Sequence, residues 1–468
     1  MHRPYAHHHT YVSKRIRIGI IMGGFSSERH ISVESGRNVY EKLASSVLYT
    51  PIPIFLSGTS ENHQLFILPL NLLLKDSADD IHEKLREVSG SVQEATMAPI
   101  RREVAGITHK YAGKADSQPH RISYAALAEC VDVVFIALHG RPGEDGILQA
   151  ILEQHDIPYN GSGVACSHVT MDKFKTNQYL RSQGFCVADQ MLVKKSVWKQ
   201  KPSALTHAIE MQFSYPVIAK PTDEGCSTAV VKIKNRAMLQ AYASAIFGTS
   251  AALTTYHTSM LRLKPNIDFP KRDQFLIEAL VEKEDAAYFL EITGGLLTHL
   301  DAAGKRHYEL FEPSETLARG EILTLEEKFL AGEGQNITPA CFHPDPTVNR
   351  QITDQVKVDL ANVAQVLDLE GYARIDAFVK VYSPTHIETW IIEVNTLPGM
   401  TPATCIFHQC ALHGYRPFDF IHAIIQYSLQ KYHQRSSTYD LEYPSLKGIS
   451  AALEPDDGRL VQHRGVIL

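Results

Sequence analysis

The sequence lacks the features that mark several large classes of protein. No apolar run is long enough to cross a membrane, and residues 1–15 have no apolar core of the kind that a signal peptide needs. The net charge of −6 provides no excess of basic residues with which to bind a nucleic acid. These absences predict a protein that binds neither a membrane nor a nucleic acid.

Cysteine is scarce and irregularly placed. The seven cysteines form no CxxC pair and no regular framework, which favours a reducing compartment and predicts a cytoplasmic location. Cys405, His408, Cys410 and His413 lie close in sequence. Their spacing matches no standard zinc pattern, so buried or incidental residues are the favoured interpretation. The GxxxxGK[ST] signature is also missing, which excludes a P-loop nucleotide site, and there are no internal repeats.

What the chain does have is the size and pattern of a multidomain α/β protein. Its 468 residues, 44% of them hydrophobic, give room for several domains. Residues 16–22 form an apolar run that ends in two glycines and is followed by helical periodicity, and residues 131–154 repeat this order. The polar stretch at about 57–121 is interpreted as an insertion. The segment 167–184 predicts one amphipathic helix, ended by Gly184.

Four polar residues stand inside two apolar segments that read as strands: Arg374, Asp376, Glu393 and Asn395. Because side chains alternate along a strand, a hairpin would put all four on one face, with Asp376 opposite Ile391 and diagonal to Glu393. Carboxylates held together repel unless a proton or a cation intervenes, and oxygen ligands suit Mg²⁺, so a metal site is one interpretation. A solvated strand face with an Arg–Asp pair is the other. This stretch alone leaves both open.

Three further places in the chain carry chemical information. Glu28 follows the paired glycines at the start of a helix, where it either stabilises the helix end or holds a substrate ammonium. His139 stands at the carboxyl end of a buried strand, where open α/β sheets place ligands, although a structural histidine is the alternative. Lys173 and Lys220, with the small-residue loop 222–228, suggest a site for a nucleotide triphosphate.

Taken in order, six motifs resemble those of the D-alanine:D-alanine ligase family of ATP-grasp enzymes: GGFSSERHISVESG, LHGRPGEDGILQA, IPYNGSGV followed by MDK, VIAKPTDEGCST, RIDAFV and IIEVNTLPGMTP. The similarity spans about residues 16–430. It implies an α/β (α+β) fold of three domains, with a Rossmann-like N-terminal domain and two sheets that clamp ATP. The implied units are an N-terminal domain at 14–168, a central domain at 169–284, a C-terminal catalytic domain at 285–435, and a tail at 436–468 with no assigned role.

The resemblance also implies ATP and two Mg²⁺ or Mn²⁺ ions as cofactors, with a role for each matched residue. The implied metal ligands are Asp376, Glu393 and Asn395. The implied ATP-contacting residues are Lys173, Lys220, Glu224, Ser227, Glu278, Leu280, Asp285 and Lys328. The implied substrate-binding residues are Glu28, His139, Arg374, Gly399, Thr404, Phe329 and Cys226. The implied catalytic residues are Glu28, Arg374, Gly399, Lys328 and Ser227.

The activity implied by the resemblance is the ATP-dependent joining of two D-alanines through an acyl phosphate, for peptidoglycan precursor synthesis, by a cytoplasmic homodimer. Phe329 stands where most dipeptide-forming members have a tyrosine, and Cys226 replaces a serine thought to bond with that tyrosine. In the family, this phenylalanine accompanies D-lactate as second substrate, so a D-alanine:D-lactate ligase is an alternative. Another ATP-grasp carboxylate–amine ligase and an inactive nucleotide-binding regulator are the others.

Overall fold

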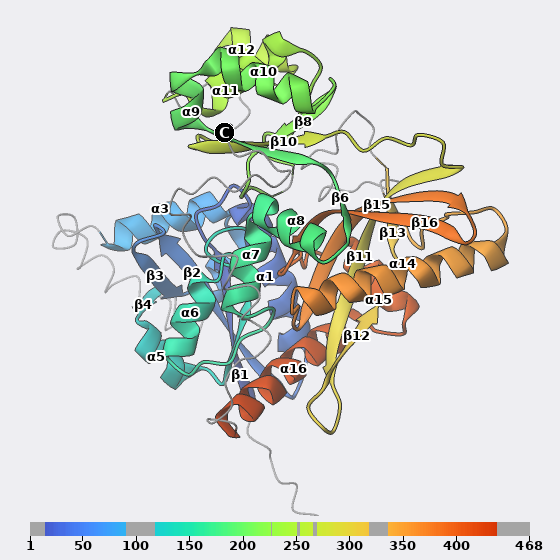
Figure 1. Ribbon diagram of the computed structural model, residues 1–468. Helices are drawn as coiled ribbons and strands as arrows, with labels where there is room; N and C mark the ends of the chain where they lie inside the picture. Colours follow the sequence, from blue (N-terminus) through green and yellow to red (C-terminus); the bar gives the residue numbers. More distant parts are fainter. Residues whose placement is uncertain are drawn as a thin grey trace, which may run out of the picture.

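The computed structural model arranges the chain in three β-sheets, each accompanied by helices (Figure 1). It describes residues 15–89, 118–225, 227–249, 253–264, 269–317 and 336–437. In the view of Figure 1 the first sheet, in blue, lies at the left, the third sheet, in yellow and orange, lies at the right, and the second sheet with its green helices lies above both.

The first sheet has five strands in the order β4-β3-β2-β1-β5. They are β1 (Ile16–Gly23), β2 (Tyr49–Gly58), β3 (His63–Ile67), β4 (His120–Ile122) and β5 (Val133–Ile136). β1 pairs in parallel with β2 and β5, whereas β3 and β4 add antiparallel at one edge. The helices of this region are α1 (Arg29–Ala44), α2 (Leu70–Lys75), α3 (Ala78–Ser89), α5 (Tyr124–Cys130) and α6 (Ile147–Gln154). The two predicted strand–turn–helix units are confirmed. Both ends of the predicted insertion contribute a strand, β3 and β4.

The turn after β1 explains how the first functional loop is placed. Residues 18–23 of β1 are all buried, as expected for a strand with helices on both faces. Gly23 and Gly24 have φ of +92° and +81°, in the left-handed region that favours glycine. A Cβ on Gly23 would lie 2.5 Å from Cε2 of Phe55. The glycines therefore let the chain turn sharply over β2 and place Glu28 at the N-cap of α1.

The second sheet has four antiparallel strands in the order β7-β10-β8-β9. They are β7 (Gln190–Lys194), β8 (Val217–Lys220), β9 (Val231–Ile233) and β10 (Gln274–Ala279). Its helices are α9 (Lys195–Gln200), α10 (Pro202–Gln212), α11 (Arg236–Ile246) and α12 (Thr255–Leu261). The four helices gather on the side of the sheet away from the rest of the molecule, which leaves the other side facing the third sheet (Figure 1).

The third sheet has seven strands, with the order β14-β13-β11-β15-β16-β6 and with β12 paired to β11. They are β6 (Cys186–Val187), β11 (Tyr288–Leu300), β12 (Arg306–Leu310), β13 (Ser314–Thr316), β14 (Asn336–Ile337), β15 (Tyr372–Ser383) and β16 (His386–Asn395). Its helices include α14 (Pro346–Val366), α15 (Cys405–Leu412) and α16 (Pro417–Ser437). The predicted hairpin is β15 and β16.

The helix predicted as one piece over 167–184 is two helices, so that prediction is wrong. α7 (Val164–Met171) ends at Asp172, and α8 (Lys173–Ser182) begins at the next residue. The Asp172 side chain accepts from the backbone N–H groups of Phe174 and Lys175, which satisfies donors at the start of α8. The break gives Lys173 the first position of a new helix. Among the described residues, no helix is both long and apolar enough to cross a lipid bilayer.

Candidate active site

A cleft lies between the second and third sheets, where β8 and β10 face β15 and β16. Six of the eight predicted ATP-contacting residues line it: Lys173, Lys220, Glu224, Ser227, Glu278 and Leu280. The predicted metal-binding carboxylates, Asp376 and Glu393, belong to its wall. Asp285 and Asn395 do not line the cleft itself. Residues far apart in sequence therefore meet here, as the predicted clamp between two sheets requires.

Strands β15 and β16 form one wall of the cleft through cross-strand pairs. Arg374 lies opposite Asn395, and Asp376 lies opposite Glu393. The predicted register, with Asp376 opposite Ile391, is wrong because a β-bulge follows Asp376 and moves Ile391 opposite Ala377. Such a bulge adds one residue to one strand and re-aims its side chains. Here it brings the two carboxylates into direct opposition.

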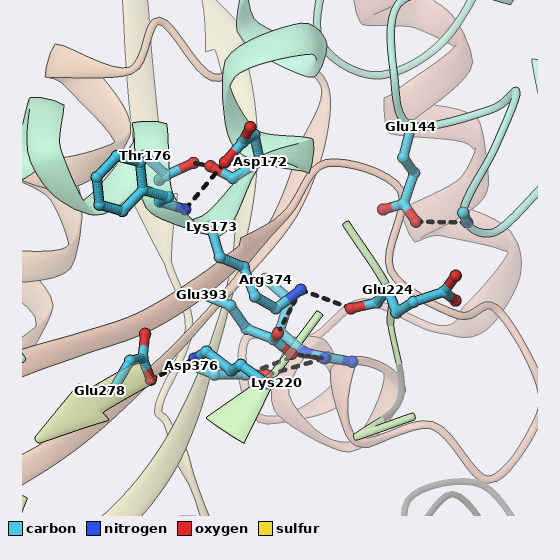
Figure 2. Close-up of polar contacts among 12 residues, drawn as sticks. Glu144, Asp172, Lys173, Thr176, Lys220, Glu224, Glu278, Arg374, Asp376 and Glu393 are labelled. Carbon is cyan, nitrogen blue, oxygen red and sulfur yellow. Dashed lines mark hydrogen bonds and ion pairs between the residues drawn. The ribbon is translucent and has the colours of Figure 1, made fainter. Parts of the chain in front are cut away.

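Arg374 and Asp376 form a buried ion pair on this wall (Figure 2). Nε and Nη2 of Arg374 each donate to a different Asp376 oxygen at 2.9 Å, and Nη2 lies 3.9 Å from Oε1 of Glu393. The two side chains are only 12% and 9% exposed, so the interpretation as a solvated strand face is wrong. Burial alone would lower the pKa of Arg374, but the charges of Asp376 and Glu393 raise it. The guanidinium therefore stays charged beside the cleft.

Lys173 connects this wall to the loop of the second sheet. Its Nζ donates to the carbonyl oxygen of Glu224 at 2.6 Å and lies 3.3 Å from Oε2 of Glu393 (Figure 2). The ammonium thus stands between the carboxylate of β16 and the loop between β8 and β9. Because Asp172 caps the helix that begins with Lys173, the break between α7 and α8 positions this charge.

Lys220 closes the other side of the cleft. Its Nζ lies 2.6 Å from Oε2 of Glu278, and Nε2 of Gln190 donates to Oε1 of the same carboxylate at 2.6 Å. Lys220 and Glu278 come from neighbouring strands, β8 and β10, and both side chains are buried. A buried ammonium at the end of an apolar strand requires such a partner. The ion pair holds both predicted ATP contacts at the wall of the cleft (Figure 2).

The loop between β8 and β9 is held by charges that the sequence did not suggest. Arg272 pairs with the carboxylates of both Asp223 and Glu224, and Arg141 lies 3.1 Å from Asp223 across from the first sheet. Burial raises the pKa of the Glu224 carboxyl. With its carboxylate on Arg272, Glu224 presents its backbone oxygen to Lys173. Ser227 has φ of +58° and lines the cleft in the same loop.

Glu28 lies where the first sheet meets this loop, and it is buried. An added Cβ on Gly225 would stand 2.5 Å from its Oε2, and one on Gly140 would stand 3.3 Å from the same atom. The carboxylate therefore lies between the loop that follows β5 and the loop that follows β8. Glycine at both positions permits this close approach.

His139 fastens the segment after β16 rather than facing outward. Its Nδ1 lies 3.0 Å from the carbonyl oxygen of Leu397, which can only accept, so Nδ1 carries the proton and Nε2 accepts from the Ser35 hydroxyl at 2.8 Å. Ser35 in turn accepts from the Met400 N–H at 3.0 Å. Burial and the charge of Arg374 lower the pKa of His139 to about 4, so the ring is neutral. Its predicted contact with a substrate stays a prediction.

Glu144 is a partly buried acid of this region that the sequence reasoning did not select. Its Oε2 accepts from the Gly140 N–H at 2.8 Å and its Oε1 accepts from the Leu397 N–H at 3.1 Å. Burial and the nearby charge of Glu28 raise its pKa to about 7. The available signal was its place in the loop after a buried strand, the same signal that selected His139.

The segment after β16 carries two of the predicted substrate-binding residues, Gly399 and Thr404. Asn38 donates through Nδ2 to the Met400 carbonyl at 2.8 Å, which with Ser35 fixes the backbone next to Gly399. Thr404 is buried, and its hydroxyl lies 2.8 Å from that of Thr401. The predicted residues Lys328, Phe329 and Cys226 lie outside the described residues.

Comparison with known proteins identifies the family of this chain. Models of the D-ala D-ala ligase N-terminus and C-terminus match residues 17–162 and residues 179–253 with 275–426. The chain belongs to the D-ala D-ala ligase family. A D-alanine–D-alanine ligase of Caldicellulosiruptor bescii is 26% identical over 423 residues, covering 90% of this chain and 98% of the relative.

Two solved D-alanine–D-alanine ligases have the same fold as this member of the D-ala D-ala ligase family. The structure from Coxiella burnetii has a TM-score of 0.58 and 18% identity, and the alignment covers 91% of this chain and 97% of that one. The structure from Bacillus anthracis complexed with ATP has a TM-score of 0.53 and 20% identity, covering 90% and 99%. The predicted family, its ATP-grasp fold and its class of enzyme, an ATP-dependent ligase, are confirmed.

The side chains predicted as metal ligands fit the chemistry of Mg²⁺ in this D-ala D-ala ligase family member. Asp376, Glu393 and the amide of Asn395 offer oxygen donors from facing strands, and Asn395 Nδ2 is buried without a hydrogen-bond partner. The carboxylates now pair with Arg374 and Lys173, so a metal would compete with those cations. Within the described ranges, no group of three or more His, Cys, Asp or Glu is placed to hold a metal ion. The metal site stays a prediction.

Proposed function

We propose that this chain joins two D-alanine molecules at the expense of ATP, to make D-alanyl-D-alanine for peptidoglycan precursors. The observation that carries the proposal is the set of paired charges, largely withdrawn from water, formed by Arg374, Asp376, Glu393 and Lys173. It stands where the nucleotide cleft meets the loops that hold Glu28 and Gly399. The D-alanine ligase names of the relatives support the same substrate.

ATP is proposed to lie in the cleft with its base against Leu280 and Phe378 and its phosphates near Lys173, Lys220 and the loop of Ser227. The two ammonium groups supply the positive charge that phosphoryl transfer requires. Glu278 has to release Lys220 in part when a phosphate arrives, because one ammonium cannot pair fully with both. The similar ligase from Bacillus anthracis, whose structure is complexed with ATP, supports a nucleotide as the ligand.

The proposed ligands of Mg²⁺ or Mn²⁺ are Asp376, Glu393 and Asn395. When bound, the ions would neutralise negative charge on the phosphate oxygens. Arg374 donates two hydrogen bonds to Asp376 and lies 3.9 Å from Glu393, so both carboxylates already stand beside a positive charge at the place where a metal would bind.

The proposed reaction has two steps. A carboxylate oxygen of the first D-alanine attacks the γ-phosphorus of ATP, the bond to ADP breaks, and an acyl phosphate forms. The amine of the second D-alanine then attacks the acyl carbon and loses a proton, and inorganic phosphate leaves. Arg374 and the Gly399 N–H are proposed to stabilise the oxyanion of this step; one such donor is typically worth about 3 kcal/mol.

Glu28 is proposed to hold the ammonium of the first D-alanine, since it is a buried carboxylate next to the loop between β8 and β9. His139 is proposed to act with it by fixing the 397–400 segment through Leu397 and Ser35. A neutral ring suits this task because it does not repel the substrate ammonium.

The second acceptor is where a rival function has support. Phe329 in place of tyrosine and Cys226 in place of serine remove two hydroxyls that would bond to each other. Neither substitution therefore leaves a hydroxyl without its hydrogen-bond partner. D-Lactate arrives without an ammonium and suits a less polar subsite. A D-alanine:D-lactate ligase is therefore the second candidate, with an ester as its product.

One experiment tests the proposal and its rival together. The full chain is incubated with ATP, Mg²⁺ and equal amounts of D-alanine and D-lactate, and the products are identified by mass spectrometry. We expect D-alanyl-D-alanine as the main product of the wild type, and Phe329→Tyr to increase the ratio of dipeptide to ester. A main product that is the ester would favour the rival, and an unchanged ratio in Phe329→Tyr would contradict the role of residue 329.

The remaining alternatives are separated by the same assay. Magnesium-dependent phosphate release excludes an inactive regulator. A screen of amino acids coupled to ADP release would reveal another carboxylate–amine ligase by its preference for an acid other than D-alanine. The predicted homodimer and cytoplasmic location follow from the resemblance and the cysteine pattern, and they stay predictions.

A further inference from the structure

A buried lysine stands next to the wall of the nucleotide cleft, beyond the residues assigned to the reaction. Along β15, Arg374, Asp376, Phe378 and Lys380 occupy alternate positions and so share one face of the strand. Asp376 and Phe378 line the cleft, and Lys380 occupies the next position along this face, with its side chain only 2% exposed. An ammonium that is withdrawn from water this far costs free energy unless it is paired.

Among the described residues the ammonium of Lys380 has two partners, one in the lining of the cleft and one in the chain segment that continues from it. Its Nζ lies 4.9 Å from the centroid of the Trp390 ring, which lines the cleft beside Phe378. It also lies 3.2 Å from Oε2 of Glu284. The first contact is a cation–π interaction with the back of the wall, and the second is an ion pair with the chain that connects β10 to β11.

Glu284 lies in the segment from which the second sheet passes to the third. Leu280 and Val281, at the start of this segment, line the cleft. Its end is tied to β15 by a hydrogen bond from the Ala287 N–H to the Val381 carbonyl at 2.8 Å. Glu284 has φ of +51°, a left-handed conformation that a residue with a Cβ adopts when its surroundings hold it there. The ion pair to Lys380 is such a constraint.

Trp390 is fixed from a second side. Its Nε1 donates to Oε2 of Glu388 at 2.8 Å, and Glu388 lies opposite Lys380 in the sheet. Glu388 therefore holds the N–H edge of the indole, and the face of the ring lies toward the Lys380 ammonium. A hydrophobic side chain at position 380 would fill the same space without the cost of burying a charge. The presence of Lys380 is consequently better explained by the positions in which it holds Trp390 and Glu284 than by a gain in the stability of the fold.

We propose that Lys380 is a positioning residue for the base end of the nucleotide cleft, which fastens the 280–287 segment to Trp390 and so sets the affinity for the nucleotide. This inference rests on the proposed function for the identity of the ligand. Lys380 does not reach the reacting atoms, because Phe378 separates it from Asp376 along the strand. Its loss should therefore weaken nucleotide binding and leave the chemical step intact.

The chain offers its own probe for the test. It contains two tryptophans, Trp198 in α9 and Trp390. Trp198 packs in the helical layer of the second sheet, near Phe247, and does not line the cleft. A Trp198→Phe parent protein therefore reports the surroundings of Trp390 alone. Titration of this parent with MgADP should give a saturable change in emission, from which the dissociation constant follows.

In the parent, Lys380→Met should raise the dissociation constant of MgADP and the KM for ATP on the order of tenfold, while kcat at saturating ATP stays within about twofold. Glu284→Gln should raise both on the order of threefold, because its side chain is largely exposed and an exposed pair is weaker. The double variant should bind no more weakly than Lys380→Met alone. Lys357→Met in α14, which breaks an ion pair with Glu312 away from the cleft, should leave the dissociation constant unchanged.

Two results would overturn the inference. One is unchanged MgADP affinity in Glu284→Gln, a substitution on an exposed side chain that keeps the test valid even if Lys380→Met does not fold. The other is a fall in kcat with unchanged KM for ATP, which would place Lys380 in the chemical step. A parent that bound neither MgADP nor MgATP in calorimetry would overturn the proposed function and this inference with it. If only the inference about Lys380 is wrong, the parent will still bind the nucleotide normally.

Discussion

Glu393 lies beside two cations, and a neutral side chain would lose both charge contacts; this gives the first prediction. Its Oε2 lies 3.3 Å from the Lys173 ammonium, and its Oε1 lies 3.9 Å from Nη2 of Arg374. Glu393→Gln should lower kcat for ADP release by at least about 10²-fold, because charge stabilisation of this kind is worth several kcal/mol. The control is Asp354→Asn on the exposed face of α14, which should retain full turnover. Turnover of Glu393→Gln equal to that of the control would contradict the assignment of the site.

Glu144 predicts a dependence of stability on pH. Its pKa rises from the ordinary value of 4.5 to about 7 in the folded state, so the folded protein holds this proton more tightly than the unfolded chain does. The free energy of unfolding should therefore decrease as pH rises from about 4.5 to about 7, by up to about 3 kcal/mol for this group. In Glu144→Gln this part of the pH dependence should be absent.

Urea denaturation of both proteins at pH 5, 6, 7 and 8 measures the effect. The amide accepts only one of the two backbone N–H groups that Glu144 accepts, which shifts the level of stability but not its slope with pH. Glu129→Gln, an exposed position in the same part of the chain, should keep the slope of the wild type. Parallel curves for wild type and Glu144→Gln would contradict the raised pKa.

For single residues, the sequence predicted the side-chain directions that follow from alternation along a strand. It missed those that depend on a β-bulge or on a contact with a distant segment. The common face of Arg374 and Asp376 followed from the period of a strand, whereas the bulge after Asp376 had no signal in the sequence. Glu144 was missed because an acid in a glycine-rich loop is most often solvated. One of the two N–H groups that it accepts from belongs to Leu397, which is 253 residues further along the chain.

Among the elements, α8 carries the third prediction, because its N-cap positions a charge of the cleft. Asp172→Ala removes the acceptor for the N–H groups of Phe174 and Lys175, which should cost about 1 kcal/mol of stability. It should also raise the KM for ATP severalfold, since Lys173 begins the same helix.

A second N-cap makes the control for this prediction. Asn235 caps α11 by accepting from the Met238 N–H at 3.0 Å, in a helix that does not line the cleft. Asn235→Ala should lose a similar amount of stability, measured by urea denaturation, with the KM for ATP unchanged. Equal KM values in the two variants would show that the cap of α8 has no part in nucleotide binding.

The elements themselves were largely predictable, with one instructive failure. Apolar runs and glycines located β1 and α1, and periodicity located α6. The continuous helical pattern over 167–184 concealed the break between α7 and α8. Asp172 is itself an N-cap residue, so the signal for the second helix was present, but periodicity outweighed it.

For the whole molecule, the position of the cleft could not be worked out from local patterns. β8 and β10 belong to one sheet and β15 and β16 to another, and the facing of the two depends on contacts between distant segments. The resemblance to a family supplied that arrangement before any coordinates, because six motifs in order imply a shared fold. The charges that hold the loop after β8, Arg272 and Arg141, belong to this chain and were not implied.

A cleft between two sheets predicts that its ligand stabilises the folded molecule as a whole. A ligand that binds only the folded state adds about 2.7 kcal/mol at a concentration one hundred times its dissociation constant. Saturating MgADP should therefore raise the Tm of the wild type by several degrees, and ADP with EDTA should raise it less, because an ion held by the proposed ligands Asp376 and Glu393 would add to the binding of the phosphates. Asp376→Asn should lose this difference between MgADP and ADP while it keeps the stabilisation by ADP alone, since the base and the lysines still bind. Scanning calorimetry of both proteins with each ligand measures it, and a metal effect of the same size in Asp376→Asn would remove Asp376 from the proposed metal site.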